Sequence, residues 1–397
     1  MRWLTTLAAL TSAVAVSRAA EPAPLVEKYL HSGELAVGDR GLQRALDAAP
    51  DDDQLRFGLG VLRFVRAVER LGQSLYEYGA KSESTSVPFL RLPVPENPDP
   101  TPITYPILRR IFEQCTDDLA RAEATLAGVK DDNVSLPVHF AGVRLDFVGD
   151  GTSRTTLVDV LKKLTGQRRF EFLEKNPKFL VRFDRGDVAW LRAYCHLLSA
   201  LLDAYLALDG KFLFDAEAEN HFAKPKGQAA NKPDLFAVLL SGGVKFPEPA
   251  RLYSFRLHMI RVCELNRETW RLIRAETDDD HEWLPNPRQK GVLGLPVRDE
   301  MIDGWLRAVD ELERLLKGEK LIDVRLPGVA EGMAINVRAF LDDPPAKLDV
   351  NKILGQGVDA KYLSKLTGEN RYDDGGFNRV MALFGDSMGV AYMAWFN

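Results

Sequence analysis

The sequence has little cysteine. Its 397 residues include three, Cys115, Cys195 and Cys263. An odd, low count argues against a disulfide framework, and no Cys-x-x-Cys or zinc-finger spacing occurs. Each cysteine lies within a helical pattern, where the residue usually behaves as a small buried apolar side chain. A Cys195–Cys263 bridge stays open as an alternative if the chain reaches an oxidising compartment.

The sequence also lacks the short motifs of common enzyme classes. It has no glycine-rich dinucleotide fingerprint, no Walker loop, no nucleophile elbow and no kinase signature. These absences leave an enzyme possible, because catalytic groups converge in space rather than in sequence. Whether the chain is an enzyme is undecided from its residues, and a non-enzymatic role is favoured.

An excess of positive charge is absent as well. The formal net charge is -5 and the pI is near 5.8, whereas a nucleic-acid-binding protein needs a basic face. After the N-terminal leader no segment is long and apolar enough to span a membrane.

A hydrophobic content of 46% is enough for a sizeable core, and the length predicts two domains or one large one.

The N-terminus has the pattern of a secretory signal peptide over residues 1–19. Arg2 supplies the positive charge, and a short apolar run extends from Leu4 to Val16. Ser17 and Ala19 place small residues at the positions that signal peptidase requires, so we expect cleavage after Ala19. The mature protein is therefore predicted to be periplasmic or extracellular.

Apolar residues at spacings of three and four predict a mainly α fold. The expected long helices cover 107–126, 187–209, 251–276 and 301–316. Residues 317–397 are richer in glycine, proline and aspartate, and there we expect an irregular region with a few short strands. The expected organisation is a signal peptide (1–19), helical hairpins (20–81), a proline-rich loop (82–106), a helical core (107–316) and the C-terminal region (317–397), which packs on that core.

Residues 22–80 resemble tetratricopeptide repeats, a family of stacked helix pairs. With Pro50 as the closing proline of one unit, the small and large positions of that unit are filled by Leu25, Tyr29, Gly38, Leu42 and Ala45. The next unit then carries the Leu59-Gly60 pair of the family. The resemblance implies a helical platform that binds a protein or peptide partner; an ordinary helical hairpin is the alternative.

The segment 187–209 is predicted to be the central helix. It carries two apolar stripes, which indicate burial on two sides, and Asp187 is placed to cap its first turn. Between the stripes lies a narrow polar row. The row consists of Arg192, His196, Ser199 and Asp203.

The polar row allows two interpretations. As a catalytic site, it would use His196 as acid and base and Asp203 as its orienting group or as a metal ligand. Otherwise it is the solvent edge of the helix, or a structural network with neighbouring charged residues.

Residues 146–157 resemble a degenerate EF-hand calcium loop. Asp146 and Asp150 occupy the first and fifth ligand positions, and Gly151 stands at the sixth. Val148 and Leu157 replace the ligands at the third and twelfth positions, so the bidentate acid is missing. The alternative is a turn that caps a helix over 155–164.

The run 278–282 is the most polar stretch of the chain. Asp280 and His281 together offer oxygen and imidazole ligands that suit a divalent metal. A solvated loop explains the same residues.

We therefore predict an exported binding or scaffold protein that acts through a helical groove. One alternative is an exported hydrolase or metal-dependent enzyme that uses His196 and Asp203. A second is a structural protein stabilised by a divalent metal such as calcium, bound at Asp146 and Asp150.

Overall fold

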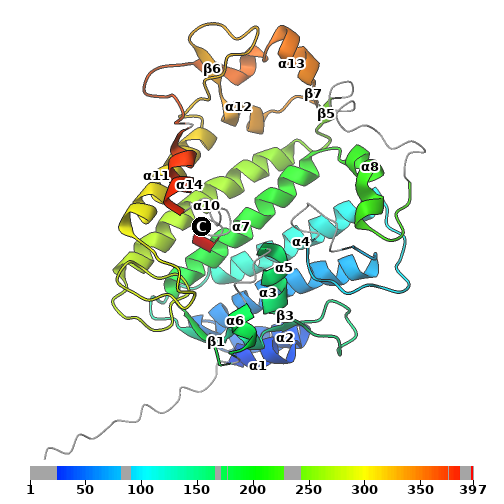
Figure 1. Ribbon diagram of the computed structural model, residues 1–397, viewed down its shortest axis with the longest axis vertical. Helices are drawn as coiled ribbons and strands as arrows, with labels where there is room; N and C mark the ends of the chain where they lie inside the picture. The colour runs from blue at the N-terminus through cyan, green and yellow to red at the C-terminus, as the bar shows by residue number, and fades with distance from the viewer. Residues whose placement is uncertain are drawn as a thin grey trace, which may run out of the picture.

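The computed structural model places most of the chain in packed helices (Figure 1). The residues that it describes are 25–81, 91–165, 171–176, 178–227, 243–373, 375–384 and 395–396. The predicted signal peptide lies outside this part. Within the described part, no helix combines the length and the apolar character that crossing a membrane requires.

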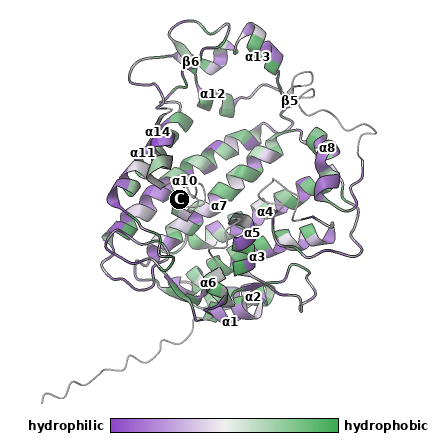
Figure 2. Cartoon of the chain, in the orientation of Figure 1, coloured by the Kyte–Doolittle hydropathy of each residue, from purple (hydrophilic) through white to green (hydrophobic). Residues whose placement is uncertain are grey.

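The long helices pack against one another in the order in which they occur along the chain, and α3, α4, α7 and α10 lie side by side (Figure 1). Most carry apolar residues on one side and polar residues on the other (Figure 2), as amphipathic packing requires. The order is α1 (Leu25–Ser32), α2 (Leu35–Ala48), α3 (Asp53–Glu77), α4 (Tyr105–Leu126), α7 (Arg185–Ala207), α10 (Ala250–Ala275) and α11 (Asp299–Leu316).

Short antiparallel strand pairs join the loops between these helices. The pairs are β1 (Leu136–His139) with β4 (Leu180–Phe183), β2 (Arg144–Leu145) with β3 (Thr155–Thr156), β5 (Val244–Lys245) with β7 (Lys347–Leu348), and β6 (Met333–Ile335) with β8 (Leu363–Lys365). Each sheet has two strands, so the strands connect helices and do not form a layer of their own. The predicted mainly α fold with a few short strands is confirmed.

Shorter helices complete the described chain. They are η2 (Phe140–Gly142), α5 (Leu157–Thr165), α6 (Glu171–Glu174), α8 (Lys211–His221), α12 (Val337–Asp342), α13 (Val350–Gln356), η4 (Ala360–Tyr362) and α14 (Gly375–Phe384). Helix α8 lies between the expected helices over 187–209 and 251–276, where no helix was predicted. Its apolar face is short. The segment that follows the helix, 222–226, forms backbone bridges with Ala80 and Ile103, and these bridges fix the end of the helix.

The N-terminal region forms helices that pack through small residues. A Cβ atom at Gly38 would meet Leu62 and Tyr29, and one at Gly60 would meet Leu126. Helix α3 runs without a break over the whole second predicted repeat unit, which is therefore one helix and not a helix pair. The tetratricopeptide resemblance stays a prediction.

Two carboxylates define the start of α7. The helix begins at Arg185, and Asp184 is its N-cap, with Oδ1 accepting from the backbone N–H of Gly186 at 2.7 Å. The side chain of Asp187 forms the reciprocal hydrogen bond, since its Oδ2 accepts from the N–H of Asp184 at 3.1 Å. This is a capping box. Asp187 was predicted to be the cap, but Asp184 is the N-cap and Asp187 is the N3 residue of the box, because the helix starts two residues earlier than predicted.

The end of the chain returns to the helical core. Phe396 is completely buried, and its ring lies 4.1 Å from that of Trp270 on α10, centre to centre. The indole N–H of Trp190 on α7 donates to the carbonyl of Trp395 at 2.9 Å. These two residues thus pack on α7 and α10; 385–394 lie outside the described part.

All three cysteines are buried free thiols. Cys195 and Cys263 do not form the bridge that the sequence left open. Burial raises the pKa of Cys115 and Cys263 to about 12, so both thiols stay protonated at neutral pH.

Candidate functional site

The polar row of α7 faces the interior. Arg192 is 8% exposed, and Ser199 and Asp203 are each 2% exposed. The exposed edge of the helix instead carries an apolar residue, Leu201. The row is therefore not the solvent edge, and its polar atoms need partners inside the protein.

Glu123 of α4 is the partner of the first half of the row. Its Oε1 accepts from the Nε of Arg192 at 3.0 Å and lies 3.5 Å from the Nε2 of His196. Burial alone would raise the pKa of Glu123. The hydrogen bond with His196 and the charge of Arg192 outweigh burial, and the pKa falls to about 2.

Residues of α10 are the partners of the second half. The Nδ1 atoms of His196 and His258 lie 2.8 Å apart, and Arg251 NH1 donates to Asp203 Oδ1 at 2.9 Å. His258 Nε2 also lies 3.8 Å from Asp203 Oδ2. The row is thus part of a polar network across α4, α7 and α10.

Chemically, the network can share one proton between two imidazoles, because only one ring can donate in an Nδ1–Nδ1 contact. Burial lowers the pKa of His258, and the neighbouring His196 lowers it further. A hydrolase would need a substrate to reach this row, yet Ser199 and Asp203 are buried. The arrangement favours a structural network, and the catalytic role of these residues stays a prediction.

Asp146 and Asp150 both bind the amides of their own loop. The two side-chain oxygens of Asp146 accept from the N–H groups of Gly149 and Gly151, each at 2.8 Å. Asp150 Oδ1 accepts from the N–H groups of Thr152 and Ser153. These bonds close the turn before α5, and Arg154 NH1 also lies 2.9 Å from Asp146 Oδ2. Calcium binding by this loop stays a prediction.

Asp280 and His281 lie at the surface and contact each other. Their side chains meet at 2.8 Å between Oδ1 and Nδ1, and Asp280 Oδ2 also pairs with Arg182 at 2.9 Å. His281 has a positive φ of 65°, which is uncommon outside glycine. After this turn the next residue, Glu282, is buried.

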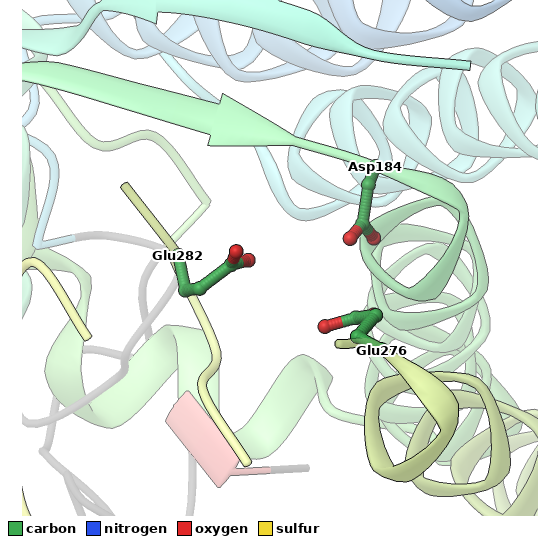
Figure 3. A group of neighbouring side chains, drawn as sticks. All are labelled: Asp184, Glu276 and Glu282. Atoms are coloured by element: carbon green, nitrogen blue, oxygen red, sulfur yellow. The ribbon is translucent and has the colours of Figure 1, made fainter. Parts of the chain in front are cut away.

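Glu282 belongs to a group that the sequence did not predict. Its carboxylate and those of Asp184 and Glu276 converge from the loop after α10, the start of α7 and the end of α10 (Figure 3). One oxygen from each lies within 4.8 Å of the others, the only such group of three acidic or metal-binding side chains in the described residues. We call these three residues, together with Asp187, the acidic centre.

Burial raises the pKa of every member of the acidic centre, and the charges of its neighbours add to the rise at Asp187, Glu276 and Glu282. Burial, together with the charge of Asp184, raises the pKa of Glu276 to about 9, and burial raises that of Glu282 to about 7. Burial raises the pKa of Asp187 well above its ordinary value, and the charges of Asp184, Glu276 and Glu282 add to the rise. The sequence signal that could have revealed the centre is the pair of acids at the start of α7, Asp184 and Asp187, together with those after α10.

A polar cleft of about 470 Å³ lies between α3 and α4. The segment 97–101 of the proline-rich region and residues 148–149 complete its wall. Polar lining residues are Arg70, Gln73, Ser74, Glu77, Asn97, Asp99, Thr101, Gln114 and Asp118. The protonated thiol of Cys115 is part of the apolar remainder.

The two ends of the cleft differ in charge. At one end Arg70 donates to Asp118 Oδ1 at 2.5 Å, and Arg121 reaches the same oxygen. One buried carboxylate therefore accepts from two guanidinium groups, of which only that of Arg70 lines the cleft. Glu77 lies on the same helix as Arg70, seven residues later, which is about 10 Å along the axis.

Comparison of the chain with protein-family models, curated proteins and solved structures finds no match. The roles of its residues therefore rest on their own contacts, burial and charge.

Proposed function

We propose that this chain is an exported helical binding protein whose ligand site is the cleft between α3 and α4. The observation that carries the proposal is an open, polar cleft of about 470 Å³ beside α3, one of the helices that the sequence predicts to bind a partner. Ligand pockets in proteins have volumes of roughly 300–1,000 Å³. The cleft is large enough for a few residues of a peptide.

The charges of the cleft support a short peptide as the ligand. The guanidinium of Arg70 is suited to an acidic group, because it can donate two parallel hydrogen bonds to a carboxylate. Glu77 at the other end is suited to a basic group. Between them, Gln114 is exposed and can hydrogen-bond a peptide backbone. A peptide with one acidic and one basic group about 10 Å apart matches this arrangement.

The binding test uses isothermal titration of the mature protein with short peptides that carry one acidic and one basic residue. We expect saturable binding that Arg70→Ala weakens about tenfold, since a hydrogen bond to a charged group contributes roughly 1.5–3 kcal/mol. Gln114→Leu should weaken it less.

Arg261→Ala is the matched control, because Arg261 has nearly the same side-chain exposure as Arg70, 39% against 38%, and also pairs with an acid. It should bind like the unchanged protein. Absence of binding, or equal binding by Arg70→Ala, would rule out the cleft as a peptide site.

Export is supported by the leader pattern of residues 1–19. The test is expression of the full chain in a secreting bacterial host, followed by N-terminal sequencing of the protein outside the cytoplasm. We expect the mature chain to begin at Ala20. An uncleaved chain that stays in the cytoplasm would contradict export.

A further inference from the structure

The acidic centre contains a carboxylate oxygen whose partner is missing. Asp187 is 5% exposed, and its Oδ2 accepts from the N–H of Asp184. Its other oxygen, Oδ1, is buried and has no hydrogen-bond partner within the described structure. A buried acceptor without a partner costs about 1–3 kcal/mol, and more when it is charged. The oxygen therefore points to a ligand.

Asp187 lies against Asp184 of the centre, because its Oδ2 accepts from the N–H of Asp184 at 3.1 Å and its own backbone N–H donates to Asp184 Oδ1 at 3.3 Å. The charges that act on its carboxylate are those of Asp184, Glu276 and Glu282, which converge from three segments (Figure 3). The unpartnered oxygen and the three converging carboxylates thus belong to one place in the fold.

No basic side chain neutralises this group within the described residues, where no ion pair joins a lysine or arginine to any of the four acids. The nearby Arg182 pairs with Asp280, and Arg185 pairs with Glu268 and Asp132. The amide of Gln289 donates to Glu276 Oε2 at 3.2 Å but carries no charge. Buried charges are normally paired or bound to a metal, which makes a positive ligand a fitting partner for this centre.

We propose that Asp184, Asp187, Glu276 and Glu282 bind a hard divalent cation, of which calcium fits best. The donor set is all carboxylate, which suits calcium, magnesium or manganese and not the softer metals that prefer thiolate and imidazole. Calcium bonds to oxygen are about 2.3–2.6 Å long. One calcium ion can therefore contact oxygens as far apart as the 4.8 Å within which one oxygen each of Asp184, Glu276 and Glu282 lies.

The position of the site gives the cation a structural role. It joins the beginning of α7, the end of α10 and the loop that carries Glu282. The C-terminal end of a helix has partial negative charge, which favours a cation beside Glu276. The bound ion therefore links the start of α7 to the end of α10 and holds the loop of Glu282 against both helices.

The test measures calcium binding by titration calorimetry on the chelator-treated full chain, with thermal unfolding as the second readout. We expect one calcium ion per chain and a rise in Tm on adding calcium, because a ligand of the folded state stabilises it. Glu276→Gln and Glu282→Gln should each weaken calcium binding at least about tenfold, since changes even beyond the ligands cost 10–100-fold.

The same substitutions should not lower the Tm of the calcium-free protein, because glutamine keeps the size of each side chain and carries no charge. Loss of calcium binding without loss of stability separates loss of a ligand from loss of folding. Glu300→Gln, an exposed acid on α11, is the control and should change neither readout.

Three results would overturn the proposal. The first is no calcium binding and no change of Tm, which would mean that protons alone neutralise the centre. The second is unchanged binding by a Glu276→Gln, Glu282→Gln double variant. The third is loss of binding in Asp150→Asn instead, which would place the cation in the loop of residues 146–157.

Discussion

Glu69 is a buried acid whose titration should be visible in the stability of the protein. Its Oε1 accepts from the backbone N–H of Asp146 at 2.8 Å. Burial raises the pKa of Glu69 to about 7, and the charge of Asp146 adds to this, although the N–H of Asp146 and two arginines oppose it. The folded protein therefore holds this proton more tightly than the unfolded chain, where the pKa is near 4.5.

The free energy of unfolding should fall as pH rises from 4.5 to 7, because over this range the unfolded chain binds fewer protons than the folded protein. Well above pH 7 the contribution of Glu69 to the free energy of unfolding changes no further. Glu69→Gln keeps the acceptor for the Asp146 N–H but removes the titration. The unchanged protein should lose up to about 3 kcal/mol of its free energy of unfolding between pH 4.5 and 8 because of Glu69, and the variant should not lose it. The difference between the two proteins should therefore shift by that amount in favour of the variant.

Urea unfolding at both pH values measures this difference, with Glu300→Gln as the exposed control. An equal difference at the two pH values would show that Glu69 does not titrate in this range.

At the scale of elements, close contacts of glycine set the spacing of α3 from its neighbours. A Cβ atom at Gly72 would overlap the ring of Phe147, and one at Gly60 would lie 2.5 Å from Leu126 Cδ2. Phe147 and Leu126 are almost completely buried, so neither can move without disturbing the core.

Gly72→Ala should therefore destabilise the protein by about 1–3 kcal/mol, the usual cost of overpacking a core. Gly355→Ala in α13 is the matched control, because its Cβ atom would meet no atom within 4 Å. There alanine should be neutral or stabilise by up to about 1 kcal/mol, since it favours the helix. Chemical denaturation of both variants tests the contact, and equal effects would contradict it.

At the scale of the whole molecule, the end of the chain holds three helices together. Phe396 packs on Trp270 of α10 and on Trp305 of α11, while the preceding Trp395 accepts from Trp190 of α7. Residues far apart in sequence thereby share one apolar cluster.

Phe396→Ala should destabilise the folded protein by about 3–5 kcal/mol, the cost of removing a buried phenylalanine side chain. Phe172→Ala, at a side chain that is 38% exposed, should cost clearly less. Guanidinium unfolding measures both variants. A small effect of Phe396→Ala would mean that the C-terminus contributes little to the core.

The long helices were predictable because helical periodicity is a local property. Apolar residues three and four apart mark one face whatever the rest of the chain does, and the predicted ends of α4, α7, α10 and α11 lie within two residues of the observed ones. Helix α8 was missed, since its support comes from backbone pairing with distant segments. The unbroken course of α3 was not predicted either.

The polar groups show most clearly what could be predicted from the sequence and what depended on the tertiary structure. The spacing of Arg192, His196, Ser199 and Asp203 placed them on one face of a helix, and this holds in the structure. Their partners Glu123, His258 and Arg251 come from two other helices, and no local pattern joins residues so far apart. The acidic centre likewise exists only because the end of α10 packs beside the start of α7. Local chain geometry decides which residues share a face, but tertiary packing decides which charges meet, and whether water or protein surrounds them.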